Sequence, residues 1–419
     1  MELAGMSRAA ADAGSVAERP DTRPRRGVTA LDWWLATRIQ RTMDDGPVRL
    51  ELWDGSSPYR LPDRPAGDLV VADRRALLGL AVHPNLYFGE SYMSGRVLVR
   101  GPLPAVVEAL SRSSAGRSPW QERISSALSR SNTPAAARRN VHHHYDLGND
   151  FYRLWLDPEM VYTCAYFATP DTSLAEAQVM KLDLVCRKLR LRAGETVVEA
   201  GCGWGALALH MARRYGVRVK AFNISKEQLA FARERAARED LAGRVEFIDD
   251  DYRNVKGTFD VFVSVGMLEH VGLSHYSTLA AALRRVLKRD SGRGLLHFIG
   301  RDVPRPLNAW IRRRIFPGGY APTLAEVATA VLAPARLSIV DVENIRLHYA
   351  LTLSHWIRQF GAAEARVRAQ YGDEFYRAWE LYLAGARAAF ATGWMQLFQV
   401  VFSPRESAPP FWTRKEADY

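Results

Sequence analysis

A glycine-rich turn after a short apolar run is the clearest chemical signal in this 419-residue sequence. The run Thr196–Ala200 leads into Gly201, Gly203 and Gly205, and a helical pattern follows. Glycines let the backbone approach a ligand closely, and the first turn of a helix offers N–H donors and partial positive charge. The turn therefore predicts a cofactor site, for either a dinucleotide or S-adenosylmethionine.

The spacing of the turn and the residue before it favour S-adenosylmethionine. The turn reads GCGWG, whereas the dinucleotide pattern is GxGxxG. Glu199 stands two residues before the first glycine, where a carboxylate could bind a cationic ligand, although it could also cap the next helix or pair with Lys220. The following strand-like run ends at Asn223 and Ile224, with Gln228 one helical turn further, where the adenosine ribose and base would lie.

The elements around this turn alternate between strands and helices. Beyond residue 140 the strand-like runs TVVEA, VRVKAF, VEFID, FDVFVSV and GLLHFI are separated by helical patterns at 206–215, 226–240 and 276–287. This alternation predicts a doubly wound, Rossmann-like α/β domain with a parallel sheet. After GLLHFI come a basic, aromatic segment at 301–334 and helical stretches at 351–395, which we expect to shape the substrate pocket.

The N-terminal part of the chain has a different character. Residues 1–28 contain almost no large apolar side chains and are predicted to be a disordered tail. Residues 29–112 combine a helical pattern with short alternating runs, which indicates a small α+β domain. Residues 113–138 are rich in Ser, Arg, Ala and Pro and are predicted to be a linker. The α/β domain would then occupy residues 139–419.

Composition and charge favour some binding partners and one cellular compartment over others. The net charge of +11 indicates an anionic partner, and we favour a phospholipid surface because no helix-turn-helix or aromatic–basic RNA motif occurs. No run is long and apolar enough to span a membrane and no secretory signal is evident, so a cytoplasmic protein is expected. Three cysteines without CxxC spacing and an isolated run of histidines at 142–144 predict no disulfide framework and no metal site.

Further blocks resemble the cyclopropane-fatty-acyl-phospholipid synthase family, whose members are class I S-adenosylmethionine-dependent methyltransferases. These blocks are HHHYDLGNDFYRLWLDPEMVYTCAYF, VVEAGCGWGALALHMA, VSVGMLEHVG and LLHFIG, in this order. The resemblance runs from about residue 140 to QLFQVVFSP near the C-terminus. The N-terminal region is similar to the one that accompanies the branch acting on phospholipids, which implies a membrane phospholipid as substrate. For residues 139–419 the family resemblance implies helical lipid-binding insertions and an acyl-chain site.

The resemblance implies methyl transfer to a cis double bond of a phospholipid acyl chain, loss of a proton and closure of a cyclopropane ring. It also implies a bound bicarbonate as the base. The implied catalytic positions are Cys164, Glu269, His297, Ile299 and Tyr349. We also predict cofactor binding at Tyr162, Thr163, Tyr252 and Arg253. A related enzyme that leaves a methylene or methyl branch stays open, whereas a non-catalytic binder is disfavoured because the glycine turn and these residues occur together.

Membrane contact is predicted for the segment 301–320. Five arginines alternate there with Trp310, Ile311, Phe316 and Tyr320. Arginines attract anionic headgroups and Trp and Tyr favour the membrane interface, although a solvated basic face would have the same composition. We therefore expect peripheral association with the inner face of the cell membrane, and we leave a homodimer open.

Overall fold

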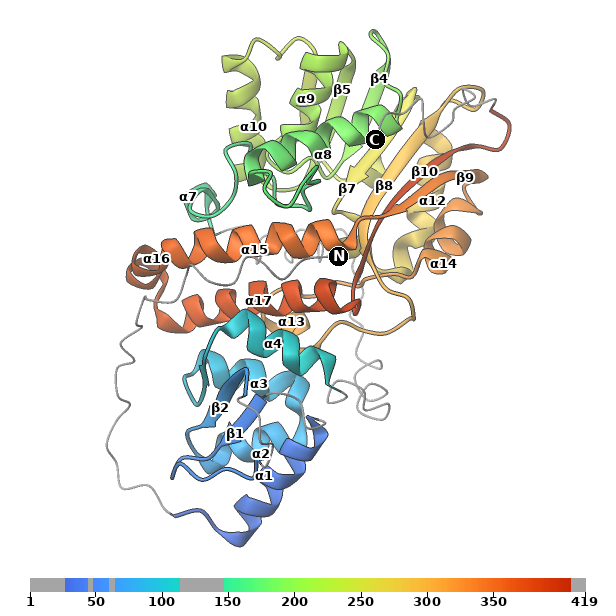
Figure 1. Ribbon diagram of the computed structural model, residues 1–419. Coiled ribbons are helices and arrows are strands. Elements are labelled where there is room, and N and C mark those ends of the chain that lie inside the picture. The colour runs from blue at the N-terminus through green and yellow to red at the C-terminus, as the bar shows by residue number, and fades with distance from the viewer. Residues whose placement is uncertain (1–26, 44–47, 60–64, 114–146, 408–419) are drawn as a thin grey trace.

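The computed structural model describes residues 27–43, 48–59, 65–113 and 147–407, and Figure 1 shows its ribbon. Nearly all of the predicted tail, most of the predicted linker and the histidine run 142–144 lie outside the described residues. Within those ranges, no helix is both long and apolar enough to cross a membrane.

The N-terminal elements form a small sheet covered by helices. The strands β1 (Val48–Glu51), β2 (Gly67–Val71) and β3 (Val97–Arg100) lie in this order, with β1 parallel and β3 antiparallel to β2. The helices are α1 (Ala30–Thr42), α2 (Arg74–Val82), α3 (Pro84–Met93) and α4 (Leu103–Arg112). Leu50, Val71, Leu77, Val97 and Val106 pack together between sheet and helices, so this α+β unit has its own hydrophobic core.

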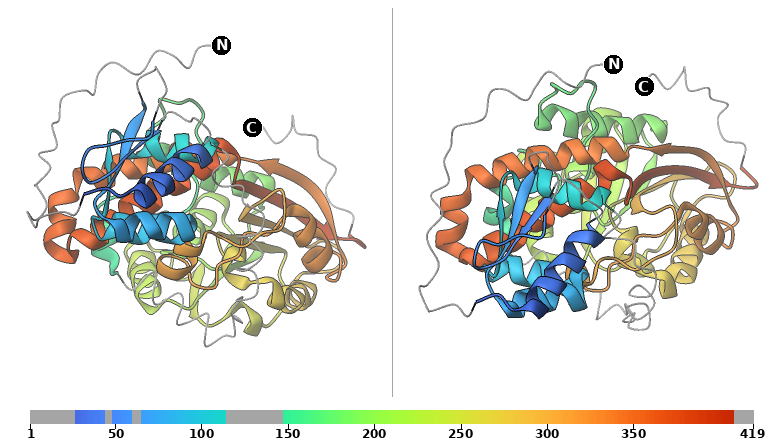
Figure 2. Two further views of the ribbon diagram at one scale, coloured as in Figure 1. Left: turned by 90° about the horizontal axis from the view of Figure 1, so that it is seen from below. Right: turned by 60° about the horizontal axis from the view of Figure 1, so that its bottom comes forward.

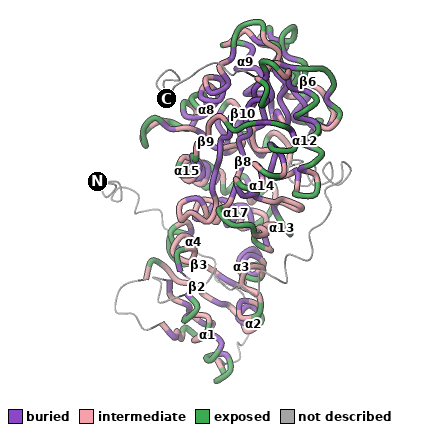
Figure 3. The backbone as a smooth tube through the Cα atoms, turned by 90° about the vertical axis from the view of Figure 1, so that its right-hand side faces the viewer, coloured by how far each residue is buried: buried purple, intermediate pink, exposed green. Residues whose placement is uncertain are grey.

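The larger unit contains a seven-stranded sheet in the order β6-β5-β4-β7-β8-β10-β9. The five parallel strands are β4 (Thr196–Ala200), β5 (Arg218–Asn223), β6 (Val245–Asp249), β7 (Val261–Val265) and β8 (Arg293–Gly300). The strand order runs outward from β4 in both directions, so the sheet is doubly wound, as predicted, with its switch point beside β4. Figure 3 shows the strands β8 and β10 as largely buried backbone.

Helices cover both faces of this sheet because its strands are apolar on both sides. Val197 faces the core formed with α8 (Leu174–Lys188), α9 (Ala206–Tyr215) and α10 (Lys226–Arg238). Its neighbour Val198 faces the opposite core, formed with α12 (Tyr276–Val286), α14 (Leu324–Val327) and the π-helical turn η4 (Ala328–Leu332). Buried residues that point to alternate faces are typical of parallel strands between two helical layers. The predicted helices at 206–215, 226–240 and 276–287 are confirmed to within two residues.

Several short elements lie at the carboxyl ends of the strands or near them. They are α7 (Asn149–Arg153), η2 (Tyr252–Asn254), α11 (Leu268–Val271), η3 (Leu273–His275) and α13 (Ala309–Arg314). The region predicted as helical at 351–395 forms α15 (Arg346–Ala362), α16 (Glu364–Tyr371) and α17 (Asp373–Thr392). Two strands were not predicted: β9 (Leu337–Asn344) and β10 (Gln396–Pro404), which extend the sheet antiparallel to their neighbours.

Helices α15 and α17 connect the two units. Figure 1 shows them side by side between the N-terminal elements and the large sheet, and in Figure 2 α4 keeps its place along α17 when the molecule is turned. Polar contacts cross this boundary: Arg387 pairs with Glu108 at 2.6 Å, and the Trp394 indole N–H donates to the Ser111 carbonyl at 3.0 Å. The N-terminal unit is therefore attached to the same helices that cover the carboxyl ends of the strands.

The basic segment 301–320 does not present its tryptophan to a membrane. Trp310 on α13 is buried against α3, where its indole N–H contacts the Met93 sulfur at 3.1 Å. A Cβ atom on Gly89 would lie 2.3 Å from the Trp310 ring, so glycine is required there. Arg314 forms a bidentate ion pair with Glu90 at 2.6 and 2.9 Å. The prediction for Trp310 was wrong because an aromatic, basic segment can equally form an interface between two parts of one chain.

Candidate active site

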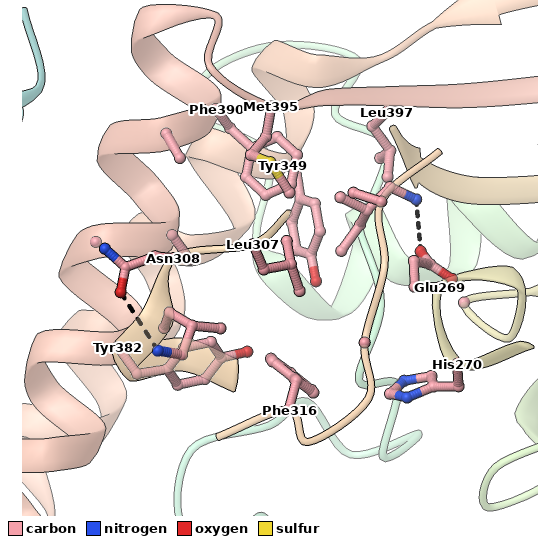
Figure 4. A pocket seen from close by; sticks show the side chains of 18 of the residues that line it. Glu269, His270, Leu307, Asn308, Phe316, Tyr349, Tyr382, Phe390, Met395 and Leu397 are labelled. Carbon is pink, nitrogen blue, oxygen red and sulfur yellow. Dashed lines mark hydrogen bonds between the residues drawn. The ribbon is translucent and has the colours of Figure 1, made fainter. Parts of the chain in front are cut away.

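A cavity of about 800 Å³ lies at the carboxyl ends of β4, β5, β7 and β8, beneath α15 and α17. The carboxyl ends of strands at a switch point are where open α/β sheets bind ligands. Residues of the glycine turn line one end of the cavity, and the side chains drawn in Figure 4 line another part of it. One continuous space therefore joins the predicted cofactor site to the predicted catalytic residues.

Two of the three glycines face this cavity. Gly201 and Gly203 have φ values of 82° and 53°, and a Cβ on Gly203 would meet no atom within 4 Å. Gly205 lies outside the cavity lining, and a Cβ there would lie 2.7 Å from the Phe247 ring and 2.9 Å from Ala232. Gly205 thus permits close packing of α9, whereas the open space at Gly203 is suited to a bound cofactor.

Glu199 is buried at the end of β4 and lines the cavity. Among the described residues its Oε2 atom has no hydrogen-bond partner, and Lys220 pairs instead with Glu246 at 3.3 Å. Burial raises the pKa of Glu199 to about 8, and the positive charge of Lys181 opposes this shift. A bound cation would favour the ionised form of this carboxyl group, and an Oε2 atom without a partner fits such a ligand. Because Lys220 pairs with Glu246, the interpretation of Glu199 as a partner of Lys220 is wrong.

Lys181 is a site residue that the sequence interpretation missed. It lies on α8, is 2% exposed, and its ammonium donates to the Thr163 hydroxyl at 3.0 Å. Burial lowers the pKa of Lys181 to about 8, while the neighbouring acidic groups at Cys164, Asp157 and Glu199 oppose this. The available signal was a lysine on the apolar face of an amphipathic helix, a position where lysine is rarely placed without a partner.

The predicted adenosine side is held together by side-chain hydrogen bonds. The Asn223 amide donates to the Gly203 carbonyl at 3.1 Å and to Gln228 Oε1 at 2.8 Å, and the Ile224 N–H donates to Asn223 Oδ1 at 2.8 Å. The remaining predicted cofactor-binding residues also line the cavity: Tyr162, Thr163, Tyr252 and Arg253. Apart from Gly205, the structure therefore places every predicted cofactor-binding residue on one cavity.

The five predicted catalytic residues also line this cavity: Cys164, Glu269, His297, Ile299 and Tyr349. The Tyr349 hydroxyl points into the pocket between Leu307 and Glu269 (Figure 4). The Cys164 thiol donates to the Ala165 carbonyl at 3.1 Å, and complete burial raises its pKa, so the nucleophilic thiolate is disfavoured. A binding role suits Cys164 better than covalent chemistry.

Glu269 is a buried carboxyl group whose side chain accepts one backbone hydrogen bond. Its Oε1 atom accepts a hydrogen bond from the Ile299 N–H, and its buried Oε2 atom has no partner among the described residues. Burial raises the pKa of Glu269 to about 7, and the Ile299 N–H opposes this shift. Burial also lowers the pKa of the adjacent His270 to about 4, so this ring is neutral at pH 7. A protonated Glu269 would present an O–H donor to the cavity.

A chain of buried polar groups determines which nitrogen of His297 carries the proton. Lys188 donates to Gln399 Oε1 at 2.7 Å and also pairs with Glu343. Because an ammonium can only donate, the amide nitrogen of Gln399 faces His297 Nδ1, at 3.1 Å. Nδ1 must then accept, and burial keeps the ring neutral by lowering its pKa. The proton of His297 is therefore on Nε2, which leaves the ring an N–H donor for the cavity.

The fold and the glycine turn define an S-adenosylmethionine-dependent methyltransferase, and comparison with known proteins specifies the family. Residues 132–400 match the family model for mycolic acid cyclopropane synthetase. A probable fatty acid methyltransferase of Pseudomonas putida is 36% identical over 85% of this chain and 91% of its own length. The chain belongs to this family of lipid-modifying methyltransferases.

Two further comparisons support the same family. The cyclopropane-fatty-acyl-phospholipid synthase of Escherichia coli strain K12 is 40% identical over 62% of this chain and 66% of its own length. The crystal structure of the mycolic acid cyclopropane synthase CmaA1, complexed with SAH and CTAB, superimposes with a TM-score of 0.60 at 31% identity, covering 63% of this chain and 97% of that chain. The expected family and class I methyltransferase fold are thereby confirmed.

Proposed function

We propose that this protein transfers a one-carbon unit from S-adenosylmethionine to a cis double bond of a phospholipid acyl chain and closes a cyclopropane ring. The observation that carries the proposal is the single cavity that joins the glycine turn to Glu269, His297 and Tyr349 through apolar walls. Support for a lipid substrate also comes from the E. coli relative, which is named for this activity.

The apolar walls of the cavity suit a reaction in which the nucleophile is an alkene. An alkene is a weak nucleophile, so the enzyme must align it with the methyl donor, exclude water and stabilise the cation that develops. S-adenosylmethionine supplies the activated methyl group when bound. The walls that would hold the acyl chain are formed by Leu307, Phe316, Phe390, Met395 and Leu397. Aromatic faces such as Phe316 and Tyr382 can stabilise positive charge nearby.

We further propose that bicarbonate binds beside Glu269, His297 and Tyr349. Three groups that can donate without carrying charge line the cavity there: the Nε2–H of His297, the Tyr349 hydroxyl, and Glu269 when it is protonated. Bicarbonate would act as the base that accepts the proton lost on ring closure. The protein's own residues would only hold this anion, because His297 is a donor here and Glu269 carries a proton below about pH 7.

Glu269 and His297 are held by different partners. Gln399 holds His297, and Glu269 accepts a hydrogen bond from the Ile299 backbone. The two side chains therefore act as separate ligands in the proposed anion site.

A test of the base is to assay the enzyme in buffer stripped of carbon dioxide. We expect turnover to fall severalfold and to recover when bicarbonate is added, with S-adenosylmethionine affinity unchanged. Full turnover in decarbonated buffer, with no bicarbonate retained by the protein, would require a base on a side chain.

The product is a second question, because the P. putida relative is named a probable fatty acid methyltransferase, a name that does not specify a cyclopropane ring. We expect lipids from a host that expresses this chain to gain one carbon and to show cyclopropane proton resonances by NMR. Branch methyl or exomethylene resonances would instead identify a branching enzyme, and an unchanged lipid profile would contradict both. We also propose action at the cytoplasmic face of the membrane and leave the homodimer to be tested by light scattering.

A further inference from the structure

Exposed apolar side chains gather on the first three helices. Of the twelve large hydrophobic residues that the described part of the chain exposes, six lie on α1, α2 and α3: Leu31, Trp33, Trp34, Leu78, Val82 and Tyr87. Leu31 and Trp34 are one turn apart on α1, and Leu78 and Val82 are one turn apart on α2, so each pair shares a helix face. We call these six residues the apical patch.

The helices that carry the apical patch pack on one another, α1 against α2 and α2 against α3. Figure 1 places α1 and α2 at the end of the molecule opposite β4 and β5. Leu31, Trp34 and Val82 are 60%, 55% and 69% exposed. Clustered exposure of this kind on one end of a molecule marks a binding surface more often than a scattered set does.

The charges around the apical patch are complementary to an anionic surface. Helices α1, α2 and α3 contain two acidic residues, and both are ion-paired: Asp32 with Arg74, and Glu90 with Arg314. The same helices expose Arg38, Arg41 and Arg75. Arg38 also lies over the Trp34 ring, 5.6 Å from its centroid. Tryptophan beside arginine is a combination that favours the headgroup region of a bilayer.

The catalytic cavity extends toward this end of the molecule. Its lining continues from Phe390 and Met395 past Leu110 on α4 to Phe88 on α3 and Ile39 on α1. The helices that carry the apical patch therefore also line the space that leads to Tyr349 and Glu269. A lipid drawn from a membrane at this end would reach the proposed catalytic residues along a lining that is largely apolar but also includes Arg38, His83 and Ser111.

We propose that the apical patch docks on an anionic phospholipid bilayer and that the acyl chain reaches the active site through the N-terminal unit. This inference rests on the proposed lipid function. It assigns membrane contact to α1, α2 and α3 in place of the segment 301–320, whose Trp310 is buried. The N-terminal unit is then the part of the enzyme that takes the substrate from the membrane.

The proposal that the apical patch docks on a bilayer is tested with the triple variant Leu31→Ser, Trp34→Ser and Val82→Ser. A matched control carries Leu273→Ser, Ile339→Ser and Leu347→Ser, which replaces three exposed apolar residues elsewhere. With vesicles of phosphatidylglycerol and phosphatidylcholine, co-sedimentation should give at least a tenfold weaker affinity for the docking variant and no change for the control. Equal binding by both variants and the wild type would overturn the proposal.

Two measurements distinguish a loss of membrane docking from a loss of activity and from a change in oligomeric state. The docking variant should retain wild-type turnover of a short-chain unsaturated phospholipid dispersed as monomers, which reports the proposed function independently of docking. If the wild type turns over no lipid in either form, the proposed function fails, whatever the vesicle result. If the variant changes the mass measured by light scattering, the patch is a contact between copies of the chain, and the docking proposal is wrong.

The proposal that the acyl chain passes through the N-terminal unit is tested with Ala81→Trp, which places a large ring on the cavity lining in α2. We expect vesicle binding and S-adenosylmethionine affinity to match the wild type, while turnover of vesicle lipid falls at least tenfold. Unchanged turnover with intact binding would show that the acyl chain reaches the active site by another path.

Discussion

The two ends of the cavity, one at the proposed cofactor-binding residues and one at the proposed catalytic residues, are built in different ways. At the cofactor end, Glu199, Gly201 and Gly203 are neighbours in the chain, and the backbone of one strand-to-helix turn forms much of the site. At the other end, His297 depends on Gln399, 102 residues away, and Gln399 depends on Lys188, another 211 residues away. The cofactor end is local in sequence, whereas the catalytic end depends on long-range packing.

The two ends should tolerate different substitutions. A local backbone site fails when a side chain fills the space that the turn leaves open. A site made of distant side chains fails when any partner is removed, because the buried polar groups left behind lose their hydrogen bonds. The two kinds of site should therefore respond differently to substitution.

Glu269→Ala should lower turnover most, by about 10²–10³-fold, because both the contact to the Ile299 N–H and the cavity donor are lost. The affinity for S-adenosylmethionine, measured by titration calorimetry, should change little. Glu269→Gln is the matched control, since the amide can still accept and donate. In the wild type, turnover should decline as the pH rises through about 7, where Glu269 loses its proton, and this decline should be absent in the Gln variant. An Ala variant with wild-type turnover would remove Glu269 from the site.

Gly203→Val should weaken S-adenosylmethionine binding by about 10²-fold, because the side chain would fill the open space of the turn. The positive φ adds strain of roughly 1–2 kcal/mol for any residue with a Cβ. Gly194→Val is the control, since Gly194 also has positive φ and open space but lies outside the cavity lining. Calorimetry should show binding lost in the first variant alone, with similar melting temperatures for both.

Gln399→Glu should lower turnover by about tenfold without removing cofactor binding. Glutamate can accept from Lys188 but cannot donate to His297 Nδ1, so the imidazole proton should move to Nδ1 and the donor at Nε2 should be lost. Nitrogen NMR of the imidazole reports this change directly, and a merely structural role for Gln399 would leave the tautomer unaltered.

Lys220→Ala should have no measurable effect on cofactor affinity, because Lys220 pairs with Glu246 on the neighbouring strand and not with Glu199. Exposed pairs of this kind contribute about 0–1 kcal/mol to stability. Lys181→Met is the contrasting variant, since Lys181 is buried beside Thr163 and Glu199, and it should weaken binding severalfold. Equal affinities for the two variants would mean that Lys181 takes no part in the cofactor end.

The same contrast explains how far the sequence alone could be interpreted. The glycine turn and the helices that follow β4, β5 and β7 have local signals, such as glycine spacing and a period of 3.6 residues, and their prediction is confirmed. The strand β10 was missed because QLFQVVFSP is buried along its whole length and shows no polar alternation. Gln399 and Lys188 gave no local signal, since a buried polar residue is identifiable only once its partner has been placed.

The small space at Gly89 has a mechanical consequence. Because the indole of Trp310 occupies the position of a side chain on α3, a rotation of α3 cannot occur without moving α13. The chain just before α13 carries Leu307 and Asn308, which line the catalytic cavity (Figure 4). A displacement of α3 is thereby transmitted through the Gly89–Trp310 contact to the wall of the proposed active-site cavity. Residues 139–419 expressed alone would lack this constraint, so the cavity should relax to a different shape.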